Sequence, residues 1–170
     1  MDFKTFFSDK TTNSKIKTES LAKAILDKEI TIDEILVFAS LQKDPIKATI
    51  IESIENVTKQ KPEFITEKNL HFIIESLSEK APRIKWESSR VIANTIHLFQ
   101  NKQVDIIPEL LKNTSHEGTV VRWSTALAFA SILKTDSPES KRIISGIKII
   151  AEKEEKNSIK KIYRAALKGK

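Results

Sequence analysis

The residues best suited to binding chemistry lie on two predicted helices that begin near positions 82 and 119. On the first of these helices, Trp86, Arg90 and Asn94 are four residues apart and therefore share one face. Aromatic and guanidinium groups dominate the binding energy of protein surfaces when they face a partner. The sequence therefore predicts a binding surface centred on Lys85, Trp86, Arg90, Asn94, Arg122 and Trp123.

The sequence leaves a structural interpretation of the same residues open. Tryptophan side chains are usually mostly buried, so Trp86 and Trp123 could instead pack between neighbouring helices. Arg90 would then stack on Trp86, one helical turn before it. Lys85 and Arg122 open their helices, a position from which they could hydrogen-bond to neighbouring turns.

The chain lacks the common motifs for catalysis, nucleotide binding and metal binding. It contains no GxGxxG, P-loop, GxSxG or HExxH pattern, and it has no cysteine. His71, His97 and His116 lie on separate segments without carboxylates at metal-ligand spacing. We therefore expect a protein that is not an enzyme and that uses no metal or cofactor.

A regular spacing connects the elements that must position these residues. An apolar residue followed by a basic residue recurs at Ile46-Lys47, Ile84-Lys85, Val121-Arg122 and Ile159-Lys160. The basic positions are separated by 38, 37 and 38 residues, from 85−47, 122−85 and 160−122. A constant period in this range is typical of stacked helical repeats.

Apolar periodicity and helix-start signals predict nine helices. Thr31 and Glu34 have the spacing of a capping box, and Asp44 and Ser137 each precede a proline as expected N-cap residues. Gly146 lies in the middle of a predicted helix, where we expect a neighbouring helix to pass close. The predicted ranges are 15–28, 32–42, 45–59, 66–79, 82–99, 105–113, 119–134, 138–154 and 157–168.

The clearest unit, residues 104–133, has an apolar helix with a proline and paired leucines, a polar turn, and a Val-Arg pair that opens an alanine-rich helix. The matching residues are Pro108, Leu110, Leu111, Val121, Arg122, Ala126, Ala128 and Ala130. This pattern resembles the HEAT repeat, including its armadillo-like relatives, and the resemblance covers roughly residues 30–168. The turn aspartate of that family is matched loosely, by Asp44 in one unit and Asn113 in another.

The resemblance implies an α-solenoid that binds other macromolecules, with its second helices lining the concave side. Together with the spacing, it predicts an all-α, right-handed α-α solenoid of about four HEAT-like helical hairpins with an N-terminal capping helix. Residues 15–170 are expected to form this single HEAT-like repeat domain, preceded by an N-terminal tail over residues 1–14. In the tail we expect Phe3, Phe6 and Phe7 to form a hydrophobic lid over the first helix, with a membrane or partner anchor as the alternative.

The net charge of +6 arises from the last 15 residues. Residues 156–170 contain six lysines and arginines and no acidic residue, so the other 155 residues sum to zero. A polar outer face on a terminal repeat and cations near a helix C-terminus account for this charge, and nucleic-acid binding is the alternative.

No segment reaches the roughly 18 apolar residues needed to cross a bilayer, and the N-terminus is not a secretory signal. We therefore expect a soluble, cytoplasmic monomer.

The expected function is a non-enzymatic protein-protein interaction scaffold with an unidentified protein partner. The alternative is a nucleic-acid-binding module related to HEAT-like DNA alkylation repair proteins. Glycosylases of that group use tryptophan, arginine and a catalytic aspartate. No aspartate lies within 83–99 or 118–134, the two helices that carry tryptophan.

Overall fold

The computed structural model describes residues 1–170 and contains ten α-helices and no strands, which confirms the predicted all-α class. Two single 3-10 turns, Ile96–Leu98 and Gln100–Lys102, connect α6 to α7, and another, Pro62–Phe64, precedes α5. The helices are α1 (Phe3–Ser8), α2 (Ser14–Leu26), α3 (Ile32–Ser40), α4 (Ile46–Gln60), α5 (Glu67–Ser76), α6 (Pro82–Thr95), α7 (Gln103–Asn113), α8 (Thr119–Lys134), α9 (Pro138–Lys153) and α10 (Asn157–Leu167). None of them is both long and apolar enough to cross a bilayer.

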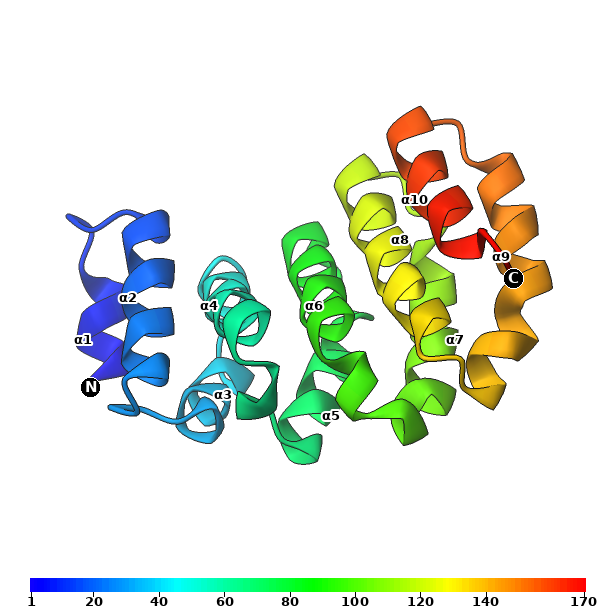
Figure 1. The fold of residues 1–170 in the computed structure, drawn as a ribbon. Helices are drawn as coiled ribbons and strands as arrows, with labels where there is room; N and C mark the ends of the chain where they lie inside the picture. Colours follow the sequence, from blue (N-terminus) through cyan, green and yellow to red (C-terminus); the bar gives the residue numbers. More distant parts are fainter.

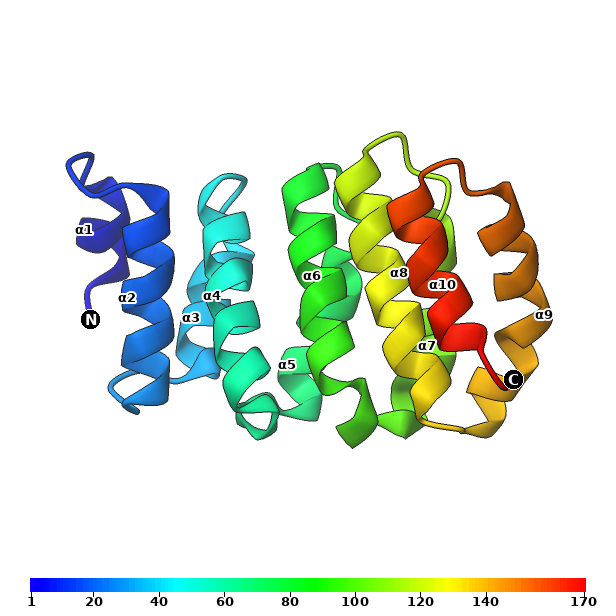
Figure 2. The same cartoon turned by 45° about the horizontal axis from the view of Figure 1, so that its top comes forward.

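The helices lie in two rows along a shallow curve (Figures 1 and 2). Helices α2, α4, α6, α8 and α10 contact one another in that order and form the inner row. Helices α3, α5, α7 and α9 form the outer row behind them. Each outer helix packs against the next helix in sequence, which gives the pairs α3–α4, α5–α6, α7–α8 and α9–α10. The inner row therefore places the predicted binding helices, α6 and α8, side by side.

Local signals set most helix starts where the sequence predicted them. Thr31 Oγ1 accepts from the Glu34 N–H at 3.2 Å, and Glu34 Oε2 accepts from the Thr31 N–H at 2.7 Å, which completes the capping box of α3. Ser137 Oγ accepts from the Ser140 N–H at 3.0 Å and caps α9. Pro82 is the first residue of α6, where its missing N–H costs no hydrogen bond.

Two boundary predictions were wrong. Asp44 does not cap α4, because that helix begins at Ile46 and the Lys47 N–H instead bonds to the Lys43 carbonyl at 3.1 Å. Helix α6 ends at Thr95, four residues before the predicted end at residue 99. The Thr95 hydroxyl donates to the carbonyl four residues earlier at 2.8 Å, a side-chain bond that competes with the backbone ladder of a helix.

One continuous core of 34 buried apolar residues holds the rows together. Phe129 of α8 and Tyr163 of α10 are its largest side chains, 0% and 1% exposed. Small residues fill the contact between inner helices, where Ser89 of α6 and Ala126 of α8 are fully buried. Small side chains let helix backbones approach closely, and this explains why α6 and α8 pack along most of their length (Figure 2).

The segment predicted as a tail contains helix α1, which packs on α2 and α3. The rings of Phe3 and Phe7 lie 5.4 and 5.7 Å from the ring of Phe38 on α3. Phe6 is half-buried against the same core. Lys17 Nζ of α2 donates to the carbonyl of Phe7 at 3.2 Å and fixes the end of α1. The three phenylalanines thus form a hydrophobic lid that covers α3 as well as the predicted helix, α2.

The expectation for Gly146 was wrong. No neighbouring helix passes close to it, because a Cβ added there would meet no heavy atom within 4 Å, and the residue is exposed. We predict that Gly146→Ala raises the free energy of unfolding by about 0.5–1 kcal/mol, since alanine loses less backbone entropy in a helix. Urea denaturation of the two proteins measures this gain.

Gly118→Ala is the matched control for this substitution. A Cβ on Gly118 would lie 3.1 Å from His116 Nδ1, the atom that accepts the Gly118 N–H at 2.9 Å. This variant should therefore gain no stability. A Gly146→Ala protein less stable than the parent would show that α9 is held in a conformation that disfavours a side chain.

Candidate binding surface

The basic residues that open the inner helices reach the ends of outer helices. Lys47 of α4 pairs with Glu79, which follows α5. Lys85 of α6 donates from Nζ to the Leu77 carbonyl at 2.9 Å and to Oδ1 of Asn113, at the end of α7, at 3.1 Å. Partial burial lowers the pKa of Lys85 more than the nearby carboxylates raise it. Lys85, a predicted site residue, therefore serves to connect consecutive helix pairs.

Arg122 of α8 makes the most complete of these connections. Its Nε lies 3.0 Å from Glu154 Oε2, and its Nη2 lies 3.4 Å from the other oxygen of the same carboxylate. Its Nη1 donates to the carbonyls of His116 and Glu117 at 2.8 and 3.1 Å. The Arg122 and Glu154 side chains are only 17% and 4% exposed. Arg122, a second predicted site residue, thus makes its contacts within the protein.

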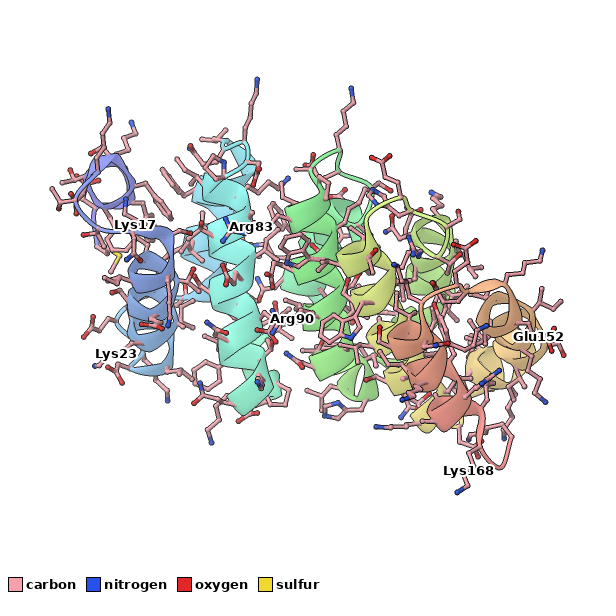
Figure 3. The ribbon with its side chains drawn as sticks, turned by 90° about the horizontal axis from the view of Figure 1, so that it is seen from above. Lys17, Lys23, Arg83, Arg90, Glu152 and Lys168 are labelled. Carbon is pink, nitrogen blue, oxygen red and sulfur yellow. The ribbon has the colours of Figure 1, made fainter.

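A buried polar cluster lies at the contact between α4 and α6. Arg90 lies between the two helices (Figure 3), where its Nη2 is 2.9 Å from Glu55 Oε1 and its Nη1 is 3.0 Å from Glu87 Oε2. Both carboxylates are almost fully buried, at 3% and 4% exposure, whereas the Arg90 side chain is 29% exposed. Asn94 Nδ2 donates to the Glu55 carbonyl at 3.3 Å and to Thr58 Oγ1 at 3.2 Å. Arg90 and Asn94 therefore join α6 to α4.

The carboxylates of this cluster are in an unfavourable environment for charge. Burial raises the pKa of Glu87, although hydrogen bonding from Trp86 and the charge of Arg90 oppose the rise. The charges of Glu52 and Glu55 push the pKa of Glu87 further up. Glu55 Oε2 is buried without a hydrogen-bond partner. The cluster thus depends on Arg90, whose guanidinium is the only cation that contacts both Glu55 and Glu87.

Sequence reasoning missed a second network, which runs across α2, α4 and α6. Arg83 Nη2 pairs with Glu52 Oε2, and the same oxygen accepts from Thr18 Oγ1 at 3.2 Å. Glu52 and Arg90 occupy the same position after their basic residues, since 52−47 and 90−85 both equal 5. These two residues do not pair with each other, so the repeat spacing gives no signal for the contact between Arg83 and Glu52.

The tryptophans are the predicted site residues that remain at the surface. Trp123 is 38% exposed and Trp86 is half-buried, with its indole N–H donating to Glu87 Oε1. Neither belongs to the core or to the half-buried side chains packed against it. The predicted stacking of Arg90 on Trp86 is absent, because that guanidinium faces the two carboxylates instead. The tryptophans lie at equivalent positions, 37 residues apart from 123−86, on adjacent helices.

The histidines do not form a site together. His71 lies 3.3 Å from Glu75 on the exposed surface of α5, and His116 accepts the Gly118 N–H. No three histidine or acidic side chains gather in a way that could hold a metal ion. Comparison of the chain with models of known protein families and with characterised proteins found no match.

Proposed function

We propose that the chain is a right-handed α-α solenoid of HEAT-like hairpins that serves as a non-catalytic scaffold for a protein partner. Support for the solenoid comes from the spacing of 38, 37 and 38 residues between basic positions and from the order of the helix pairs. The connections from Lys47 to Glu79, Lys85 to Asn113 and Arg122 to Glu154 repeat from one pair to the next. Repeated nearest-neighbour connections are what a stack of similar units requires.

The observation that carries the functional proposal is the pair of tryptophans outside the core. Trp86 and Trp123 lie on adjacent inner helices, and Val120, one turn before Trp123, is 48% exposed. Tryptophan is enriched at the centres of protein interfaces, where it supplies a large contact area at a small cost in side-chain entropy. A protein partner that lies across α6 and α8 would cover both rings, so we assign the partner to the inner row.

Substituting the tryptophans tests this proposal. Trp123→Ala should change the free energy of unfolding by less than about 1 kcal/mol, because the ring is not part of the core. The same change should weaken partner binding by about 2 kcal/mol or more, as for other interface hot spots. Affinity capture from the native cell with quantitative mass spectrometry identifies the partner. Titration calorimetry with the purified partner then measures the loss of affinity, and urea denaturation measures the change in the free energy of unfolding.

Val37→Ala is the matched control, since Val37 is 66% exposed on α3 of the outer row. It should leave the captured proteins unchanged. The proposal is wrong if Trp86→Ala and Trp123→Ala retain every partner of the parent chain. A loss of about 3–5 kcal/mol of stability in Trp123→Ala would instead assign that ring to packing.

A nucleic-acid-binding module is the second candidate function. Lys85, Arg90 and Arg122 are engaged by protein groups, so the middle of the inner row offers few free cations for phosphate. The cations that favour this candidate lie on α10, at the end of the row.

A further inference from the structure

Helix α10 and its N-cap carry five cations that have no partner within the protein. They are Lys156, Lys160, Lys161, Arg164 and Lys168, and we call this set the α10 basic face. None of them takes part in an ion pair or donates a side-chain hydrogen bond. All four other arginines of the chain contact a carboxylate. Arg164 is therefore the only arginine of the chain without a carboxylate partner.

The α10 basic face is polar along its whole length. The apolar residues Ile159 and Tyr163 are buried, 0% and 1% exposed, and α10 packs through them against α8 and α9. Lys156, Arg164 and Lys168 fall on turns of the same helix, and 168−156 gives a span of 12 residues, or about 18 Å at 1.5 Å per residue. The cations thus form a row with no aromatic or aliphatic anchor between them.

The helix macrodipole favours Arg164 and Lys168 at the C-terminal end of α10 but does not explain the cations at its start. Lys156 is the N-cap and makes no capping bond, and Lys160 and Lys161 follow within the first turns. Cations are disfavoured at a helix N-terminus, where the macrodipole is positive. Lysines and arginines four residues apart also repel one another. A polar face needed only for solubility would be better served by charges of both signs, and α10 has no acidic residue.

A hollow beside the helix adds a further cation to the row. It has a volume of about 380 Å³, lies between α9 and α10, and is lined by two apolar residues, Ala151 and Leu167, and by the charged residues Lys148, Glu152, Arg164 and Lys168. In Figure 3, Lys168 extends away from the end of α10 while Glu152 lies on α9. Three cations and one carboxylate leave this hollow positively charged.

We propose that the α10 basic face binds the phosphate backbone of a nucleic-acid duplex. Protein interfaces are depleted in lysine and depend on apolar or aromatic anchors, and the face has none. Phosphates are bound by lysine as a point charge and by arginine as a hydrogen-bonding fork. The exposed Asn157 and Ser158 add uncharged groups of the kind that also contact phosphate and sugar. Backbone contacts carry no sequence information, so binding is independent of sequence.

The test uses the full chain and a 20-base-pair DNA duplex of arbitrary sequence, with affinity measured by fluorescence anisotropy over a range of salt. The parent chain should bind, and log Kd should rise with log salt because each neutralised phosphate releases counterions. A triple variant, Lys161→Gln, Arg164→Gln and Lys168→Gln, should bind at least about tenfold more weakly at low salt. Its slope should be shallower by about 2.7, from about 0.9 per phosphate contact.

The matched control removes the same charge from elsewhere. Lys43, Lys61 and Lys80 are exposed and unpaired in the connecting segments after α3, α4 and α5, and their triple change to Gln should leave affinity and slope near the parent values. Equal losses in the two triple variants would overturn the proposal, since only net charge would matter. Absence of duplex binding by the parent chain at low salt would also overturn it.

Poly-glutamate of matched charge should not compete, and effective competition would reassign the face to acidic protein segments. Thermal unfolding confirms that every variant is folded.

Discussion

Arg122→Ala is expected to lower the free energy of unfolding by about 3–5 kcal/mol. The substitution leaves Glu154, 4% exposed, as a buried charge without its cation. It also removes the donor to the carbonyls of His116 and Glu117 and so loosens the turn before α8. Urea denaturation at about pH 7 measures the loss. A loss below about 1 kcal/mol would show that Arg122 is free for a partner, as the sequence predicted.

Two further measurements assign the loss to the Arg122–Glu154 pair. Arg122→Lys keeps the charge but cannot form the paired contacts of a guanidinium, so we expect an intermediate loss. Burial by itself raises the pKa of Glu154, but hydrogen bonds from Arg122 and the Lys156 N–H outweigh it, and the net pKa is lowered from 4.5. A lowered folded-state pKa contributes stability above the ordinary pKa that is lost as pH falls. The difference between parent and Arg122→Ala should therefore narrow below about pH 4.5.

The sequence predicted the inner row well because one local feature recurs in four of its five helices. The basic residues at 47, 85, 122 and 160 mark the starts of four helices, and α8 has its predicted bounds. Capping residues with strong local hydrogen bonds, such as Ser137 and Thr31, add starts in the outer row. Errors occurred where a local signal met a competing contact, as at Asp44, whose capping role is taken over by a backbone bond. Helix positions are therefore set mainly by short-range chemistry.

The roles of the site residues were not predictable in the same way, because their partners lie far along the chain. The acceptors of Lys47, Lys85 and Arg122 follow at 32, 28 and 32 residues, from 79−47, 113−85 and 154−122. They are of two chemical types, carboxylate and amide. Neither a fixed spacing nor a fixed residue type marks them, so exposed and paired cations look alike in the sequence. The burial of Glu55 and Glu87 was not predictable either, because it depends on how α4 and α6 pack together.

Substituting Arg90 tests whether this cation is paired within the protein or exposed for a partner. If Arg90 were an exposed member of the predicted binding surface, its truncation would cost less than about 1 kcal/mol. In the structure its loss leaves both Glu55 and Glu87 buried without a shared cation. We therefore expect Arg90→Ala to lower the free energy of unfolding by about 3 kcal/mol, as for other buried ion pairs that lose one partner. Asn94→Ala is the control on the same face, with an expected loss of about 1 kcal/mol from its neutral hydrogen bonds.

A double-mutant cycle separates lost pairing from lost packing at Arg90. Glu87→Gln removes one buried charge while its side-chain amide oxygen can still accept from the indole N–H of Trp86. If repulsion between unpaired carboxylates causes the loss, Arg90→Ala should cost less in the Glu87→Gln background, by about 1 kcal/mol or more. Burial already raises the pKa of Glu87, so the parent and the Glu87→Gln protein should differ least at acidic pH, where Glu87 is protonated. Strict additivity of the two substitutions at neutral pH would mean that Arg90 is not coupled to Glu87 and stabilises the fold through Glu55 or through its aliphatic contacts.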